Sequence, residues 1–377
     1  MTIRQGIYCS LFICMIAIPQ ARALVNLNEG TDLVLLSSTF GVGYDSNVFT
    51  RASAKSSLLE TAAASMDYNR QAGMIGVSAK ADVTSGHFEN VRDQDYVDPS
   101  LALAFRKRDG RTTGTFSLQV RRESQADPDA GARTHDWNDN GTLDLRYPVN
   151  DRYYFTNSIS TTLRDYSNNP TFSDLTTYSD SIALNYIYTS KLDLNSGYAL
   201  SISDTSLHTR AYDQSFTVGA TGGILPKISG TIRFGVERRD NDSPLGGRET
   251  FDAFTSGTSL KWQYSRKISF AGDLTEDFST TSTNLPVNRT TAGLRATANV
   301  GQKIVGNVGV IYMLSDFLGE TGNGRTDRML QIDASVAIAI TSNLRAILAC
   351  ATMVNSSNVP VAAFNRTNVT CSISATY

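Results

Sequence analysis

After residue 23, the sequence has no apolar run that approaches the roughly 20 residues of a transmembrane helix. Proline is scarce, with 9 residues in a chain of 377, and no long stretch shows the 3.6-residue periodicity of an amphipathic helix. Neither sign of charge dominates, because 34 basic residues stand against 36 acidic ones, and this balance argues against a nucleic-acid-binding protein. These absences exclude a helical membrane protein and favour β-structure.

Residues 1–23 have the three parts of a secretory signal peptide. Arg4 supplies a positive start, an apolar stretch runs from Ile7 to Pro19, and Ala21-Arg22-Ala23 is a cleavage site of the small-x-small type. The apolar stretch is too short to cross a bilayer as a helix. We therefore predict a signal peptide over residues 1–23, and a single domain over residues 24–377 that leaves the cytoplasm.

The C-terminal segment shows a strict two-residue alternation. From Val369 to Tyr377, odd positions are apolar or aromatic, and even positions carry hydroxyl groups. Other segments repeat this pattern, for example Ile228 to Glu237 and Leu330 to Ile340. Strands of an outer-membrane β-barrel need this arrangement, because one face meets lipid and the other meets the lumen.

Short polar turns recur at steps of 36 to 41 residues along the chain. The turns begin at Asn69, Lys107, Pro148, Thr189, Leu225, Ser265, Gly301 and Thr341. Between them lie pairs of alternating segments joined by longer loops, such as Ser124 to Arg133 and Asp240 to Glu249. Eight turns joining nine hairpins predict an all-β, antiparallel, up-and-down transmembrane barrel of about 18 strands, with 16 as the alternative.

The segment Phe40-Gly41-Val42-Gly43-Tyr44, followed by Asp45-Ser46-Asn47-Val48-Phe49, resembles the opening of the putative β-barrel porin 2 family. The resemblance implies an outer-membrane channel of the kind associated with exopolysaccharide loci. It also implies that the barrel-assembly machinery reads the C-terminal residues Ile373, Ala375 and Tyr377. From the residues alone, Asp45 and Asn47 are turn formers whose side chains can bond nearby backbone amides.

Charged residues on the polar faces of the strands are the candidate lining of the lumen. We expect the following residues to point inward: Lys80, Arg121, Glu123, Asp144, Arg146, Arg164, Arg233, Glu237, Lys261, Asp273, Arg295 and Asp333. The two signs are nearly balanced, which predicts weak ion selectivity unless the signs segregate around the wall. A purely structural role, with the charges paired across strands, is the alternative.

After signal-peptide cleavage, only Cys350 and Cys371 remain, too few for a disulfide scaffold or a structural zinc site. Both share the apolar parity of their strands. If the last hairpin is symmetric about residues 360 and 361, the two cysteines face each other, and a directly opposed pair lies near the geometry of a disulfide. A disulfide is therefore one interpretation, and two small lipid-facing residues are the other.

No catalytic or cofactor-binding pattern stands out. Asp136-Trp137-Asn138-Asp139-Asn140-Gly141 matches the first half of a calcium loop, but Tyr147 stands where a bidentate glutamate is needed, so we expect an Asx-rich turn on an outer loop. His87, His135 and His208 lie on different hairpins without metal-ligand spacing. We expect neither enzymatic activity nor a cofactor or metal.

The sequence therefore predicts an outer-membrane porin-like channel for hydrophilic solutes, with exopolysaccharide as a candidate cargo. The alternative is a non-conducting barrel that serves as a scaffold for a periplasmic or export complex. The expected partners are outer-membrane lipid, the assembly machinery and, for an export channel, polysaccharide or periplasmic components. Nucleic acid is not among them.

Overall fold

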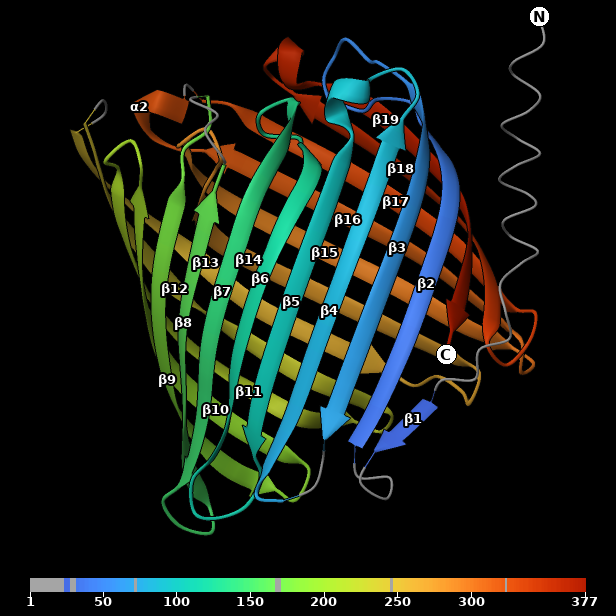
Figure 1. The fold of residues 1–377 in the computed structure, drawn as a ribbon. Coiled ribbons are helices and arrows are strands. Elements are labelled where there is room, and N and C mark those ends of the chain that lie inside the picture. Colours follow the sequence, from blue (N-terminus) through green and yellow to red (C-terminus); the bar gives the residue numbers. More distant parts are fainter. Residues whose placement is uncertain (1–23, 28–31, 71–72, 167–170, 245–246, 323) are drawn as a thin grey trace, which may run out of the picture.

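The strands of this protein close into one antiparallel barrel (Figure 1). The computed structural model describes residues 24–27, 32–70, 73–166, 171–244, 247–322 and 324–377. Strands β2 to β19 form a ring of 18, in which each strand pairs with its sequence neighbours and β2 pairs with β19. The prediction of 18 strands is confirmed. The predicted signal peptide lies outside the described residues.

The wall is made of strands of 12 to 17 residues. Its strands are β2 (Asp32–Asp45), β3 (Ser57–Arg70), β4 (Ile75–Phe88), β5 (Tyr96–Lys107), β6 (Thr113–Asp127), β7 (Ala132–Pro148), β8 (Tyr153–Asp165), β9 (Leu175–Thr189), β10 (Leu192–Thr205), β11 (Arg210–Leu225), β12 (Ile228–Ser243), β13 (Gly247–Trp262), β14 (Ile268–Thr280), β15 (Pro286–Val300), β16 (Ile304–Phe317), β17 (Thr326–Ala339), β18 (Leu344–Ser357) and β19 (Phe364–Thr376). Short helical turns η2 (Arg92–Gln94), α2 (Gly319–Gly322) and η3 (Pro360–Ala362) lie in the loops. No helix of the described chain is long and apolar enough to cross a membrane.

The two ends of the barrel differ in the length of their connections. All eight predicted short turns join strands at one end, and the longer loops gather at the other, upper end in Figure 1. Bacterial outer-membrane barrels have short turns on the periplasmic side and longer loops outside. We therefore call these the turn end and the loop end.

The seam between β2 and β19 lies at the chain termini. The backbone of Tyr377 exchanges two hydrogen bonds with Leu36, at 2.7 and 3.1 Å. Strand β2 continues toward the turn end beyond this point, and the four-residue strand β1 (Leu24–Leu27) pairs with that extension. The sequence analysis missed β1, because four residues are too few for an alternation to show. Strand β1 covers what would otherwise be a free strand edge.

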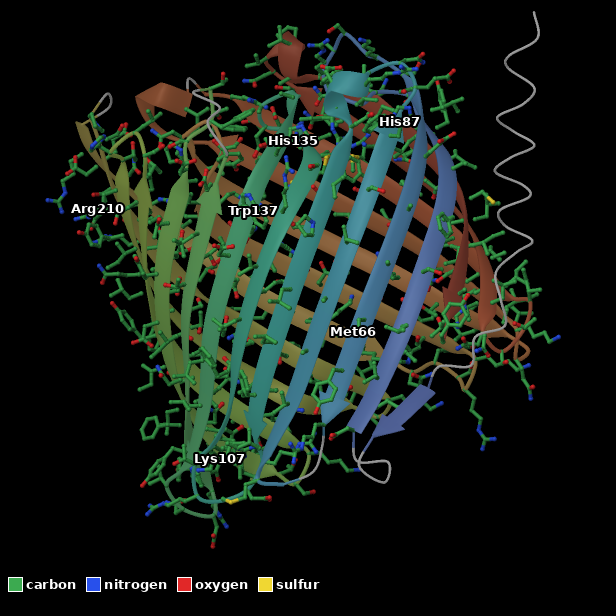
Figure 2. The ribbon with its side chains drawn as sticks, viewed as in Figure 1. Met66, His87, Lys107, His135, Trp137 and Arg210 are labelled. Atoms are coloured by element: carbon green, nitrogen blue, oxygen red, sulfur yellow. The ribbon has the colours of Figure 1, made fainter. Side chains whose placement is uncertain are left out.

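Alternation of side chains gives the wall an apolar outer face and a polar inner face. Exposed large apolar side chains line the outside, among them Met66, Leu118 and Ile332. Figure 2 shows Met66 part-way along the wall, Lys107 at the turn end, and His87 and His135 near the loop end. The side chains that are buried from water concentrate near the loop end, including Val48, Phe88 and Phe317. The protein's packed core is therefore a cap of loops and strand ends.

Several strands extend further toward the loop end than the sequence analysis predicted. The expected loop from Ser124 to Arg133 is reduced to residues 128–131, and the one from Asp240 to Glu249 to residues 244–246. The Asx-rich turn expected at Asp136 to Gly141 is wrong, since these residues lie within β7. Polar residues at these positions continue the strands because ladder hydrogen bonds to β6 and β8 outweigh their local turn preference.

The predicted opposition of the two cysteines is also wrong. Cys350 pairs with Val369 and Cys371 pairs with Leu348, so the cysteines are diagonal neighbours rather than a facing pair. Both thiols are free and exposed on the outer face. The hairpin is not symmetric about residues 360 and 361, because the η3 turn shifts the register of β18 and β19 by two residues.

Candidate functional site: the lumen and its bridged mouth

The inner wall surrounds a polar cavity of about 870 Å³ that extends over strands β6 to β14. Its lining is rich in hydroxyl and amide groups and poor in charge. Among its members are Thr115, Thr156, Ser158, Asn185, Asn195, Ser215, Thr217, Thr231 and Ser259, together with Asp144, Arg146, Arg233 and Asp273. Such a lining offers both donors and acceptors to a hydrated solute.

All twelve sequence-predicted lining residues lie on the inward face of their strands. Arg121, Glu123, Arg164 and Glu237 lie toward the loop end, and the other eight lie nearer the turn end: Lys80, Asp144, Arg146, Arg233, Lys261, Asp273, Arg295 and Asp333. A selectivity role for these residues stays a prediction.

Many of these inward charges have partners. Glu123 accepts from Arg121 at 2.9 Å and from Arg164 at 3.2 Å, and Arg164 also reaches the fully buried Asp136 at 2.9 Å. Nearer the turn end, the contacts are looser. Lys80 lies 3.5 Å from Asp82, and Arg295 lies 3.8 Å from Asp333. The loop-end charges therefore form a structural network, whereas the turn-end charges remain open to solvent and solute.

Two breaks in the strand ladder shape the loop end. Strand β6 pairs with β5 only as far as Arg121, although it continues with β7 to Asp127. Likewise, β13 pairs with β14 only from Ser256 to Trp262, although it follows β12 to Gly247. At the first break, the upper part of the β6–β7 hairpin leaves β5. At the second, the upper part of β13 separates from β14, while β12 stays paired with β11 as far as Asp242.

Side chains of β12 occupy the gap beside β14. The Phe278 N–H donates to Glu237 at 3.4 Å, and Arg239 donates to the Ser279 carbonyl at 2.7 Å. These two contacts satisfy backbone groups of β14 that β13 no longer pairs. Arg239 is fully buried and also pairs with Asp213 at 3.3 Å. The break is thus a stable feature of the wall.

The β6–β7 hairpin reaches across to the opposite side of the barrel. Strand β15 lies eight strands further round the ring than β7, close to the half-way position in a ring of 18. Even so, the Ser282 hydroxyl in the β14–β15 loop donates to Asp127, and Arg289 of β15 donates to Asp129 at 2.6 Å. The hairpin tip therefore bridges the mouth of the lumen.

The β14–β15 loop, residues 281–285, is the centre of this bridge. Besides Asp127, it receives contacts from two further loops. The Ser173 N–H donates to the Ser282 carbonyl at 2.8 Å, and Asn284 donates to the Thr209 hydroxyl at 2.9 Å. Three loops from one side of the barrel therefore meet one loop from the other side.

Asp129 is the ionic centre of the bridge. Its carboxylate pairs with Arg289, and its carbonyl accepts from Arg325 at 2.9 Å. Arg325 is itself held by three hydrogen bonds to Asp327. Burial raises the pKa of Asp129 above its usual range, against the opposing effect of Arg289. The arrangement can hold the mouth closed, and it contains a carboxylate that protonation would change.

A small apolar core supports the bridge from the side of β2 to β5. Val48, Phe88 and Val91 are almost completely buried against one another. The Arg133 guanidinium, near the tip of the β6–β7 hairpin, lies 5.0 Å from the Phe88 ring. Cation–π contacts of this kind favour a fixed orientation of the hairpin.

The predicted turn at Asp45 to Phe49 has a larger role than the sequence analysis expected. The Asn47 N–H donates to Asp45 at 3.0 Å, as a turn former should. The same Asp45 also accepts two bonds from Arg366 of β19, and Asn47 donates to the Asn365 carbonyl at 3.1 Å. The segment therefore fastens the first strand to the last.

Sequence reasoning missed the residues of the bridge, namely Asp127, Asp129, Ser282, Arg289 and Arg325. Pro128 to Gly131 has the composition of a tight turn, and this signal was available. The contact across the lumen had no sequence signal, because it depends on where β6 leaves β5. Among the described residues, no cluster has the composition of a metal site.

Comparison with known proteins supports the barrel assignment. The model of the putative beta-barrel porin 2 family matches residues 201–377, which confirms the family resemblance for the part of the chain from β10 to β19. The Asp45 to Phe49 segment lies outside that match. No curated protein matches the sequence.

Several solved outer-membrane proteins are similar to the chain in structure. The outer membrane protein OpdK from Pseudomonas aeruginosa has a TM-score of 0.49 at 11% identity, over 91% of this chain and 99% of that one. OpdQ from the same organism has a TM-score of 0.46 at 12% identity, over 92% and 97%. The FrpB iron transporter from Neisseria meningitidis has a TM-score of 0.48 at 9% identity, over 85% and 62%.

Proposed function

We propose that this protein is an outer-membrane channel that passes hydrophilic solutes between the periplasm and the outside. The observation that carries the proposal is the polar cavity of about 870 Å³ inside a barrel of 18 strands. Barrels of 16 to 18 strands generally leave an aqueous channel. The family match adds support, because the family is described as porin-like.

The loop bridge makes this channel a gated one in our proposal. Contacts from Asp127 and Asp129 to Ser282 and Arg289 cross the mouth, while hydroxyl and amide groups line the cavity below. Conduction then requires the β6–β7 hairpin to release the β14–β15 loop. Loop closures held by a few polar contacts open on fast timescales, because each contact contributes little net free energy.

Exopolysaccharide is the finer version of the proposal. Hydroxyl and amide groups such as Ser158, Thr217 and Asn195 line the cavity and can exchange hydrogen bonds with sugar hydroxyls. The sequence resemblance points in the same direction. The cavity lining contains few inward aromatic side chains, with Tyr154 as a member, and this argues against a track that is specific for sugars.

A solute-size series tests the channel. Purified protein is reconstituted into liposomes, and swelling is measured with neutral sugars from monosaccharide to pentasaccharide. We expect swelling with the smaller sugars and a steep loss of rate as size increases. An unboiled sample must first migrate differently from a boiled one on a gel, which shows that the barrel is folded. If the folded protein admits no sugar, the proposal that it is a channel is wrong.

A scaffold without conduction is the second candidate, and the bridged mouth favours it. If the contacts at Asp129 never open, the barrel presents its loops outside and its turns to periplasmic partners. If liposomes that contain either the wild type or bridge variants do not swell, the result supports the non-conducting scaffold. In both versions, we propose an outer-membrane location, and assembly by the machinery that recognises the C-terminal strand.

A further inference from the structure

The turn end of the barrel carries an excess of positive charge. Its eight turns contain eight exposed basic residues: Arg108, Arg111, Arg152, Lys191, Lys227, Arg266, Lys267 and Lys303. The same turns contain two acidic residues, Asp109 and Asp151. None of the eight basic groups forms a salt bridge within the described part of the chain. Positive charge at this end is therefore available to a ligand.

The loop end has the opposite balance. Its nine loops contain four basic residues (Arg51, Lys55, Arg92, Arg325) and six acidic residues (Glu89, Asp93, Asp95, Asp129, Asp174, Glu320). Because the whole chain is close to neutral, with a formal charge of −2, the charge at the turn end reflects a separation along the barrel axis. The two mouths of the lumen therefore present different electrostatic potentials to solutes.

Four further basic residues continue the charge into the lumen. Arg106, Arg146, Lys261 and Arg345 are exposed and lie on the inward face of the wall, within three residues of a turn. Arg146 also lines the large cavity, and its guanidinium lies 3.8 Å from the centre of the Tyr154 ring. We call these four residues the inner rim.

Two acidic side chains at this end have partners outside the inner rim. Asp193 accepts the Tyr154 hydroxyl at 2.6 Å, and Asp32 lies 3.7 Å from Arg70. None of the four inner-rim residues forms a salt bridge within the described part of the chain. Outer-leaflet or inner-leaflet lipid cannot reach the inner rim either, because its side chains face the lumen.

We infer that the turn end is a receptor for a soluble polymer bearing carboxylates, which enters the lumen from the periplasm. This inference rests on the proposed function, which places the turn end in the periplasm. Twelve basic groups spread around a mouth suit a chain with repeated negative charges better than a single small anion. The hydroxyl-rich wall above the rim then favours a carboxylated saccharide over an acidic peptide, because neutral sugar hydroxyls can continue along it.

Binding of polygalacturonate to the folded barrel in detergent tests the inference. The test variant is R106Q/R146Q/K261Q/R345Q, and the control K55Q/R92Q/R248Q/R328Q removes four charges at the loop end. We expect binding by the wild type that weakens with salt, about tenfold weaker binding by the inner-rim variant, and no more than about a twofold change in the control. Equal losses in both variants, or equal binding of neutral dextran, would overturn the inference.

Two further measurements distinguish a carboxylated saccharide from a lipid surface and from an acidic peptide. The outer variant R111Q/K191Q/K227Q/K267Q changes only exposed turn residues and keeps the inner rim. If anionic phospholipid vesicles bind and compete with polygalacturonate only through the residues changed in the outer variant, the exposed turns are a lipid contact and the inference fails. Tighter binding of polyglutamate than of polygalacturonate would overturn the saccharide assignment. Binding is measured independently of conduction. A barrel that binds polygalacturonate but never conducts would therefore refute the proposed channel and still support this inference.

Discussion

At the scale of single residues, Asp45 and Arg366 show how a local signal acquires a structural role. Asp45 is 1% exposed and accepts two bonds from Arg366 across the seam. The sequence identified Asp45 as a turn former, which its contact with Asn47 confirms. The pairing with Arg366 could not be predicted, because 321 residues separate the two and only closure of the barrel brings them together.

Replacing Arg366 should weaken the seam. In R366Q, Asp45 keeps a buried carboxylate without its cation, and we expect the free energy of unfolding to fall by about 3 kcal/mol. Urea unfolding, followed by the mobility of unboiled samples on a gel, measures this loss. The control R328Q removes an exposed arginine from the outer face of β17. Equal stability of the two variants would contradict the role of the pair.

Asp129 should give the bridge a pH dependence. Its pKa in the bridged mouth is raised above 3.8, whereas a released hairpin exposes it to water and returns the pKa toward that value. The bridged state therefore binds the proton more tightly, and acid favours it. This bias is complete below the ordinary pKa, and it is lost as pH rises through the raised one.

The expected result is a lower open probability at pH 4 than at pH 7 in planar bilayers. Asp127, Arg289 and Arg325 are the charged groups that face this carboxylate. The variant D129N should abolish most of the difference between the two pH values. A wild-type channel that opens more readily in acid would show that another group controls the mouth.

At the scale of elements, the period-2 pattern and turn composition predicted the wall. All eight turns lie where the sequence placed them, because polar turn residues interrupt apolar alternation there. Loop lengths were harder to predict. Polar residues around Asp136 read as a loop, but strand pairing with β6 extends through them. Near the loop end, the outer face is no longer apolar, so the alternation disappears while the strand continues.

The register of the last hairpin gives a prediction about its cysteines. Leu348 directly opposes Cys371, whereas the native Cys350 is diagonal to it. We expect the L348C/C350A variant to form a disulfide on mild oxidation, because directly opposed Cβ atoms approach within about 5.5 Å. Unreduced wild-type protein, once denatured, should show two free thiols. A crosslink in the wild type and none in the variant would show that the register is that of a symmetric hairpin.

The final strand should matter for assembly more than for conduction. Tyr377, which directly follows β19, exchanges two backbone hydrogen bonds with Leu36 near the turn end. Deleting Tyr377 should reduce the yield of heat-modifiable barrel severalfold, while the barrels that do insert keep the wild-type conductance. Normal assembly of the deletion would show that β19 is merely one of the wall strands.

At the scale of the whole molecule, the sequence predicted a closed barrel but not the state of its mouth. Strand number follows from counting turns, and the inward face follows from parity. The bridge from Asp127 and Asp129 to the β14–β15 loop follows from neither. It depends on two breaks in the ladder, which arise from competition between strand pairing and side-chain contacts over many residues.

Opposite charge at the two ends is also a whole-molecule property. Six of the eight turns contribute one or two basic residues each, and no single turn is unusual. Only the closed ring brings them to one rim, with the inner four leading into the cavity. The barrel has a basic turn end and a bridged loop end, so its two mouths differ. In the function that we propose, release of the bridge is the step that opens the lumen.

A reversible lock on the bridge tests this claim most directly. Asp127 and Ser282 are bonded across the mouth, so the variant D127C/S282C, made together with C350A/C371A, can join the two loops by a disulfide. Mass measurement first verifies the bond, and single-channel conductance is then recorded before and after adding a reductant. We predict that oxidised barrels stay closed and that reduction restores openings. Equal conductance in the two states would contradict the account, because the mouth would then not control passage.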